Sequence, residues 1–232
     1  MNSISKIWAH LRHEGLMRTL ARGASVVTNR WSSWRDGAMD RKYGIDTRGI
    51  VEAYETDHVG EHGSQSTGHE PIQRLLFLEM IKRLPVDVSN YTFVDFGSGK
   101  GRAVILAAHF PFQRVLGIEF SPTLNNAAKQ NIAKFTAART GAPKIDLRCE
   151  DAALSVLPAT PLICFFYNPF GPEVMRKVLD NIRDSVDKHP REVLLIYRNP
   201  VHADLFDASE GLSLAYSTRD YRVYKALSTS RQ

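Results

Sequence analysis

The stretch FVDFGSGKG, from Phe93 to Gly101, decides the fold that we expect for this chain of 232 residues. Its apolar start reads as a strand, and its glycines let the backbone turn sharply after that strand and approach a ligand closely. Open parallel sheets bind their ligands at the carboxyl ends of their strands, which is where this loop lies. We therefore predict a ligand-binding loop whose residues are Asp95, Gly97, Ser98, Gly99 and Gly101.

Strand-like and helical runs alternate along the rest of the chain. Strands are expected at residues 91–96, 114–120, 144–150, 161–167 and 192–198, with helices at 100–110, 123–139 and 172–188. Residues 212–217 and 221–227 read as an antiparallel hairpin, and an amphipathic helix is expected at 70–84. This order predicts an α/β fold: a doubly wound, mostly parallel, seven-stranded sheet that ends in an antiparallel hairpin.

The net charge of +5 is concentrated at one end of the chain. Residues 1–48 carry nine basic and four acidic residues, which leaves 21 of each sign in the remainder. Because residues 49–232 carry no net charge, we predict no dedicated nucleic-acid-binding face on the core. We divide the chain into a basic amphipathic N-terminal extension at 1–48, a loop and covering helix at 49–90, and a core at 91–232. Residues 1–40 either contact an anionic membrane or a protein, or pack against the chain's own core.

The remaining composition indicates an ordinary globular protein. Cys149 and Cys164 lie in apolar strand-like runs and are expected to be buried. Two isolated thiols and the lack of a secretory signal pattern favour the cytoplasm. His58, His62 and His69 match no metal-binding pattern, so no metal is expected. Their segment, residues 44–69, reads as a loop placed to fold over a ligand.

The charge and spacing of the glycine loop favour one cofactor. Asp95 suits a cationic group and would repel a pyrophosphate, and the last gap between the glycines is one residue too short for the dinucleotide pattern. Glu119 ends the second strand about 20 residues after the glycines, the position from which a carboxylate reaches ribose hydroxyls. We therefore expect S-adenosyl-L-methionine, while a nucleotide site and a structural turn remain alternatives for the loop taken alone.

Polar and aromatic residues end the fourth and fifth strands on the same edge of the sheet. The Asn168 carbonyl could accept hydrogen bonds from an amine substrate, and Tyr167 and Phe170 could form an aromatic wall that excludes water. A plain turn at Asn168 is the alternative. Tyr197 and Arg198 are candidate substrate-binding residues, with a surface ion pair as the alternative role of Arg198.

Residues 91–200 resemble the core of the class I S-adenosylmethionine-dependent methyltransferases. VDFGSGKGR, GIEFS and FYNPFG are similar to a group of largely uncharacterised bacterial members, and FGPEV with Asn168 resembles the non-SET histone lysine methyltransferases. Asn168 also matches the Asn/Asp-Pro-Pro-aromatic signature of amino-group methyltransferases, although this chain has one proline where that signature has two. The resemblance implies a Rossmann-like fold and places Asp151 near the adenine amino group; a helix N-cap is the structural alternative for Asp151.

The same resemblance implies an enzyme that methylates an amine nitrogen, on a protein lysine or a small molecule, by direct displacement. Asn168 would orient the nucleophile, and no metal or covalent catalyst is required. Two other classes stay open. One is a nicotinamide-dependent oxidoreductase on a similar sheet, and the other is a non-catalytic protein- or membrane-binding module that keeps the fold.

Overall fold

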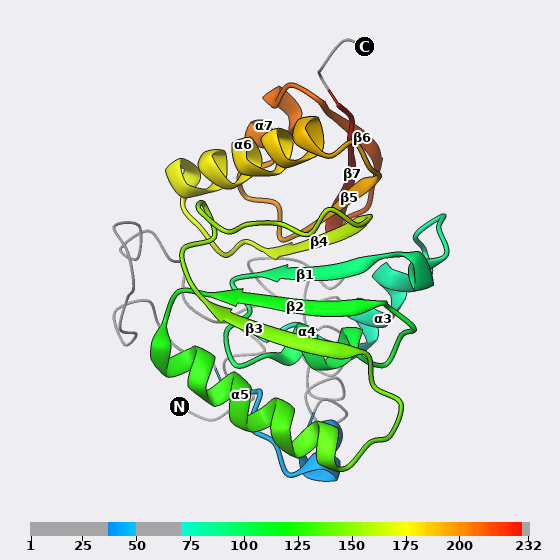
Figure 1. Ribbon diagram of the computed structural model, residues 1–232, viewed down its shortest axis with the longest axis vertical. Helices are drawn as coiled ribbons and strands as arrows, with labels where there is room; N and C mark the ends of the chain where they lie inside the picture. Colours follow the sequence, from blue (N-terminus) through cyan, green and yellow to red (C-terminus); the bar gives the residue numbers. More distant parts are fainter. Residues whose placement is uncertain (1–36, 50–70, 229–232) are drawn as a thin grey trace, which may run out of the picture.

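The computed structural model describes residues 37–49 and 71–228, which form one sheet covered by helices on both faces (Figure 1). The strand order is β3-β2-β1-β4-β5-β7-β6. β1 to β5 run parallel, and β7 and β6 form the antiparallel end. The predicted seven-stranded sheet with its terminal hairpin is therefore confirmed. The strands are β1 (Thr92–Phe96), β2 (Arg114–Glu119), β3 (Lys144–Cys149), β4 (Leu162–Tyr167), β5 (Val193–Arg198), β6 (Leu212–Ser217) and β7 (Tyr221–Ala226).

Helices divide the hydrophobic core into one cluster on each face of the sheet (Figure 1). One face is covered by α3 (Arg74–Lys82), α4 (Arg102–Ala107) and α5 (Pro122–Ala137), and the other by α6 (Pro172–Lys188) and α7 (Ala203–Ala208). A short 3-10 turn, Val88–Asn90, leads into β1. Because β4 and β5 are covered on both faces, their sequences are nearly continuous apolar runs rather than alternating ones. β1 is buried throughout as well, but it contains the polar Thr92 and the charged Asp95.

The helix starts follow from local sequence signals. Ser121 precedes α5 and its side chain accepts a hydrogen bond from the Leu124 N–H at 3.2 Å, with Pro122 at the first helical position. α6 likewise begins at a proline, Pro172, as expected. The helix expected at 70–84 instead begins at Arg74, because the backbone at Gln73 is still extended. The short helix α7 was not expected from the sequence.

The two cysteines differ in their surroundings. Cys164 is fully buried, as expected, in the middle of β4. The expectation for Cys149 is wrong, since its side chain is exposed. Among the strands of the described residues, β3 is at the edge of the sheet, so its last residue has a neighbouring strand on one side only.

Residues 37–49 pack directly on the core. Residues 37–43 are helical, and Arg102, the first residue of α4, donates hydrogen bonds from Nη1 to the Thr47 hydroxyl at 2.8 Å and to Asp40 at 3.3 Å. Asn131 of α5 exchanges two hydrogen bonds with the Asp46 backbone, at 2.9 and 2.8 Å. This part of the predicted extension is therefore joined to the core, whereas residues 1–36 and the segment 50–70, with its three histidines, lie outside the described residues.

No helix in the described ranges 37–49 and 71–228 is long and apolar enough to cross a membrane.

Candidate functional site

The glycine loop follows β1 at the carboxyl edge of the sheet, on the left in Figure 1. Gly97, Gly99 and Gly101 all have positive φ angles, of 77°, 53° and 83°, which side chains other than glycine rarely adopt. The N–H groups of Gly97 and Ser98 both donate to the Ile118 carbonyl, at 2.9 and 3.0 Å. The loop is thus a fixed turn that joins β1, β2 and the start of α4.

The glycine loop touches the turn that follows β4. A Cβ atom placed on Gly97 would lie 2.6 Å from the Cβ of Pro169, closer than any real contact. The loop and the Asn168-Pro169 turn, two separate motifs in the sequence, therefore form one packed surface at the ends of β1 and β4. The sequence gives no signal for this contact, because it depends on the pairing of the two strands.

We expect Gly97→Ala to lower the free energy of unfolding by about 3 kcal/mol, because the positive φ angle and the clash with Pro169 act together. Gly141→Ala is the matched control. Gly141 also has a positive φ, of +74°, but an added Cβ would meet nothing within 4 Å, so about 1 kcal/mol is expected. Urea denaturation measures the unfolding free energy of both variants. Equal losses of stability would show that Gly97 and Pro169 are not in contact in solution.

Two carboxylates lie beneath the loop. Glu119 is 3% exposed and accepts hydrogen bonds from the Gly99 N–H at 2.8 Å and from the Ser121 N–H at 3.0 Å. Burial raises the pKa of Glu119, and these backbone donors oppose that shift. Glu119 thereby ties the glycine loop to the start of α5.

Asp95 has a different environment from Glu119, although it is equally buried. It is 3% exposed, and no residue in the described part of the chain donates a hydrogen bond to its carboxylate. Burial raises the pKa of Asp95 to about 8, and the neighbouring charge of Glu119 adds to the shift. A buried anion without donors is unfavourable, and a bound cation would relieve it.

Asn168 adopts an unusual backbone conformation directly after β4. Its φ of 42° lies in the left-handed region, and Asn199, directly after the neighbouring strand β5, has a φ of 50°. Since Tyr167 pairs with Arg198, the two asparagines occupy matching positions on adjacent strands. Each asparagine is followed by a proline, so the two strands end in the same Asn-Pro turn.

A buried tyrosine fixes the Asn168 side chain. The Tyr197 hydroxyl accepts a hydrogen bond from the His202 N–H at 3.2 Å, so its own hydrogen is donated to Asn168 Oδ1, at 3.0 Å. The Tyr197 ring is fully buried and stacks on Phe206 with 4.5 Å between ring centroids. Tyr197 is predicted from the sequence to bind substrate; in the structure its hydroxyl donates to Asn168.

The two predicted wall residues lie on opposite faces of the sheet. Tyr167 is half-buried and packs with the cluster under α3 and α4, whereas Phe170 is buried in the cluster under α6. The structure therefore does not bring Tyr167 and Phe170 together on one side of Asn168. On the Tyr167 side, the Arg198 guanidinium lies 5.4 Å from the centre of the tyrosine ring.

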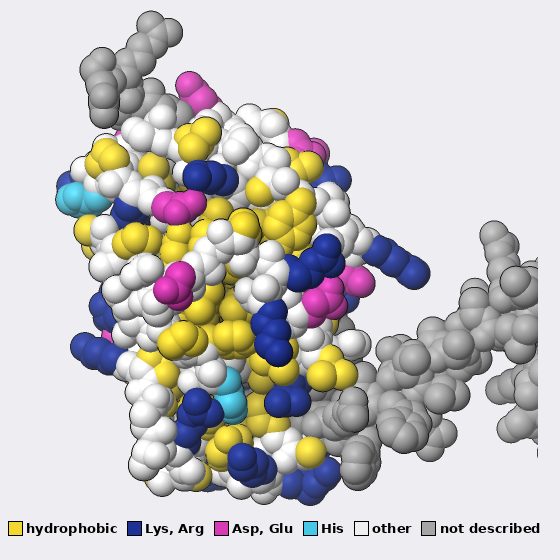
Figure 2. Space-filling view, turned by 90° about the vertical axis from the view of Figure 1, so that its right-hand side faces the viewer, with side chains coloured by type: hydrophobic (Ala, Val, Ile, Leu, Met, Phe, Trp, Pro, Cys, Tyr) yellow, Lys and Arg dark blue, Asp and Glu magenta, His cyan; other side chains and the backbone are white. Residues whose placement is uncertain are grey.

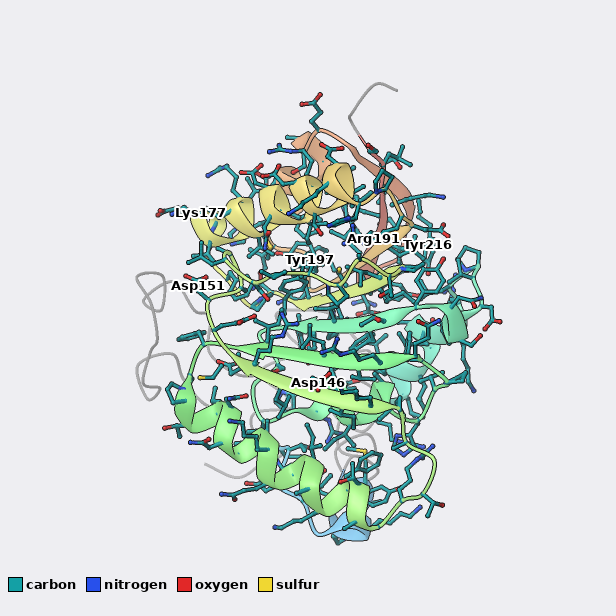
Figure 3. The ribbon with its side chains drawn as sticks, in the orientation of Figure 1. Asp146, Asp151, Lys177, Arg191, Tyr197 and Tyr216 are labelled. Atoms are coloured by element: carbon teal, nitrogen blue, oxygen red, sulfur yellow. The ribbon has the colours of Figure 1, made fainter. Side chains whose placement is uncertain are left out.

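Arg198 and Asp151, the two remaining predicted site residues, make polar contacts with residues close to them in the structure. Arg198 Nη1 donates to the Asp220 carbonyl at 2.8 Å and lies 3.6 Å from the Asp220 carboxylate, as the surface-pair alternative predicts. Asp151 Oδ1 accepts a hydrogen bond from the Ala153 N–H at 2.9 Å, so it caps the turn after β3. In Figure 3, Asp151 lies on the same side of the sheet as the ends of the parallel strands.

Known proteins resemble the chain in structure. No model of a known protein family matches it, and no curated protein sequence matches it. The magnesium protoporphyrin IX methyltransferase ChlM of Synechocystis PCC 6803, solved with bound SAM, is 18% identical, with 88% of this chain and 96% of that chain aligned and a TM-score of 0.50. The pyocyanin biosynthetic protein PhzM is 16% identical over 66% of this chain, with a TM-score of 0.50, and the chain covers 54% of its length. A mutant of MtNAS is 18% identical over 67% of this chain, with 60% of its own length covered and a TM-score of 0.50. The chain therefore has a Rossmann-like methyltransferase fold.

Proposed function

We propose that the protein is an S-adenosylmethionine-dependent methyltransferase. The observation that carries the proposal is Asp95, a buried carboxylate with no hydrogen-bond donor from the described residues, beside a glycine loop at the carboxyl ends of the strands. Such a carboxylate matches the cationic amino group of the methionyl part of the cofactor. The methyltransferase fold supports the same assignment.

The residues around the loop fit the other parts of this cofactor. Glu119 accepts backbone N–H groups from Gly99, Ser121 and Phe120, and a carboxylate with about four lone pairs can accept a ribose hydroxyl in addition. Asp151 follows β3 and would lie toward the adenine. The positive φ angles of the glycines keep the loop free of side chains, so the backbone can approach the bound molecule.

The cofactor supplies an electrophilic methyl group, so the protein mainly has to position the acceptor. We assign this role to Asn168, which lies beside the glycine loop because Pro169 packs on Gly97. Its carbonyl oxygen accepts the Tyr197 hydroxyl, and an amide oxygen has the two lone pairs needed to accept an amine N–H as well. An amine nitrogen, on a protein lysine or a small molecule, is accordingly the proposed acceptor, and Tyr197 is a positioning residue rather than a catalytic one.

Tyr197→Phe is expected to slow methyl transfer about tenfold while leaving cofactor affinity unchanged, because the Asn168 amide loses the hydrogen bond that orients it. Tyr224→Phe is the matched control. Its ring is also 1% exposed or less and lies in the same cluster, but its hydroxyl bonds Asp207 at 2.9 Å instead. Single-turnover transfer rates and cofactor Kd values test the difference, and equal rates for the two variants would remove the positioning role.

The function itself is tested by binding and by transfer. Calorimetry should detect binding of S-adenosylmethionine and no comparable binding of NAD. Binding of NAD instead would favour an oxidoreductase. Labelled cofactor incubated with a cell extract should then label an acceptor with the wild type and not with Asn168→Ala. Labelling that survives unchanged in Asn168→Ala would contradict its assigned role, and no binding of the cofactor would contradict the proposed function.

A further inference from the structure

The glycine loop needs restraint from residues outside it. Gly97, Gly99 and Gly101 hold left-handed backbone conformations, and glycine has more conformational freedom to lose than any other residue. A loop that is already ordered in its binding conformation binds a ligand more tightly, because binding then requires no further loss of backbone entropy. The side chains that hold this loop therefore contribute to the cofactor site, whether or not they touch the cofactor.

Asn131 of α5 provides such a restraint. It is 4% exposed, and its Nδ2 donates to the Lys100 carbonyl in the loop at 3.0 Å and to the Asp46 carbonyl at 2.8 Å. Its Oδ1 accepts the Asp46 N–H at 2.9 Å. Because both carbonyls can only accept, Nδ2 must face them, so the partners fix the orientation of the amide. One buried amide thus joins α5, the glycine loop and the segment 37–49.

The loop also bonds to this segment through Lys100. Lys100 Nζ donates to the Arg48 carbonyl at 3.0 Å and lies 3.3 Å from the Asp46 carboxylate. Two residues further along the chain, Arg102 Nη1 donates to the Thr47 hydroxyl at 2.8 Å. Three consecutive residues of the segment are therefore bonded to the loop and to the helices beside it, although none of the three belongs to the glycine motif.

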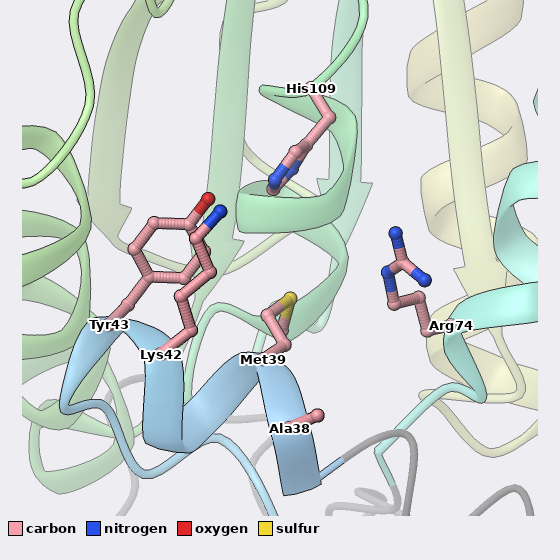
Figure 4. Close-up of a pocket in the computed structure, with 6 residues that line it drawn as sticks. All are labelled: Ala38, Met39, Lys42, Tyr43, Arg74 and His109. Atoms are coloured by element: carbon pink, nitrogen blue, oxygen red, sulfur yellow. The ribbon is translucent and has the colours of Figure 1, made fainter.

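The other contacts of residues 37–49 with the core are less complete. A pocket of about 190 Å³ separates the helical residues 37–43 from Arg74 and His109 on the core (Figure 4). Among the described residues, Lys and Arg side chains gather in the lower half of the face in Figure 2, at the end of the molecule where residues 37–49 lie in Figure 1. Empty volume forfeits packing contacts and like charges repel, so the polar contacts at the glycine loop carry much of the docking free energy.

We propose that Asn131 is a positioning residue that couples the docking of residues 37–49 to cofactor binding at the glycine loop. The inference rests on the proposed function. A docked segment holds Asn131 and Lys100 in the arrangement that orders the loop, so docking raises the affinity for the cofactor. A cofactor bound to the ordered loop strengthens docking by the same factor, because coupling between two sites is reciprocal. Release of the segment would then lower cofactor affinity without any change in the cofactor-binding residues.

Hydrogen exchange on the full chain tests the coupling from the side of the segment. Saturating S-adenosylmethionine should slow exchange of the Asp46 N–H about tenfold, because the Asn131 oxygen that accepts it is held more firmly. The Leu227 N–H, which donates to the Gly211 carbonyl beyond the end of β7, reports general stabilisation. Slowing at Asp46 that does not exceed the slowing at Leu227 would overturn the proposal.

Two alanine variants test the coupling from the side of the cofactor. Asn131→Ala leaves the Lys100 and Asp46 carbonyls without their donor and should raise the Kd for S-adenosylmethionine about tenfold. Val186→Ala shortens a side chain that is 1% exposed on α6, on the opposite face of the sheet. It should lower stability and leave the Kd unchanged. Calorimetry gives both Kd values, and an equal change in the two variants would overturn the proposal.

Lys100→Met provides a second test that leaves the buried amide in place. The Lys100 side chain is 18% exposed, so its loss should not prevent folding. The variant lacks the bonds to Asp46 and Arg48, and we expect a Kd raised about threefold and a smaller slowing of exchange at Asp46. Slowing equal to that in the wild type would overturn the proposal. A wild type that does not bind S-adenosylmethionine would instead contradict the proposed function, on which the coupling rests.

Discussion

Replacing Asp40 with alanine is expected to lower the free energy of unfolding by about 3–5 kcal/mol. Asp40 and Arg102 are almost completely buried, and Arg102 Nη1 lies 3.3 Å from Asp40 Oδ1. Asp40 also accepts hydrogen bonds from the Thr47 hydroxyl at 2.9 Å and from its N–H at 3.0 Å. Alanine would leave the Arg102 cation in the interior without its carboxylate, which costs far more than the loss of an exposed ion pair.

Asp46→Ala provides the control from the same segment. The Asp46 carboxylate is 79% exposed and lies 3.3 Å from Lys100 Nζ, so less than about 1 kcal/mol is expected. Urea denaturation at neutral pH gives both values, and an unchanged m-value shows that the same structure unfolds. Equal losses for Asp40→Ala and Asp46→Ala would mean that residues 37–49 do not dock on α4 in solution.

This buried pair shows where sequence reasoning stops. Charge counting assigned Asp40 and its neighbours to a basic extension, because a charged residue in sequence is most often a solvated one. The structure instead places Asp40 against Arg102, which itself donates from Nε to the Ile72 carbonyl at 2.7 Å. Contacts between residues so far apart in the chain depend on the tertiary arrangement, for which a single sequence carries no local signal.

The fold, in contrast, was predictable to within a few residues of each strand. Strands that are buried on both faces must be continuous apolar runs, and β4 and β5 satisfy this rule directly. Errors occur where tertiary context decides the outcome. Gln73 stays extended before α3 although the sequence pattern already appears helical there, and Cys149 is exposed because β3 is an edge strand.

The candidate site was predictable residue by residue but not as an arrangement. Asp95 and the glycines follow from a motif whose chemistry is local, since the turn and the carboxylate are adjacent in sequence. The contact of Gly97 with Pro169 and the hydrogen bond from Tyr197 to Asn168 join different strands. The sequence therefore identifies these residues but not the contacts between them. Tyr167 and Phe170 point to opposite faces for a different reason: the chain turns between them at Asn168, which has a positive φ.

Asp95→Asn is expected to make the free protein more stable at alkaline pH and to weaken cofactor binding by about 10²-fold. The folded-state pKa of Asp95 is raised to about 8, first by burial and then by the charge of Glu119, from its ordinary value of 3.8. Between these two values the folded protein holds a proton that the unfolded chain has lost. Stability contributed by Asp95 is therefore full at acidic pH, falls as the pH rises, and is lost above about 8.

Asparagine does not titrate. Between the unfolded and folded pKa values of Asp95, the unfolding free energy of Asp95→Asn should therefore rise relative to that of the wild type by up to about 1.4 kcal/mol per pH unit. Urea denaturation from pH 5 to pH 9 measures the difference, and other titrating groups cancel because both proteins contain them. Asp184→Asn, whose side chain is 72% exposed, controls for the loss of one negative charge. A constant difference between wild type and Asp95→Asn at every pH would contradict the raised pKa.

Cofactor binding should change in the opposite direction from stability. The cationic amino group of S-adenosylmethionine favours the ionised form of Asp95, so binding to the wild type should release a proton below about pH 8. Calorimetry in buffers of different ionisation enthalpy detects that proton, and Asp95→Asn should bind weakly and release none. A variant that gains stability and loses the cofactor would show that the buried charge is kept for binding, since it destabilises the empty fold. Binding equal to the wild type would instead remove Asp95 from the cofactor site.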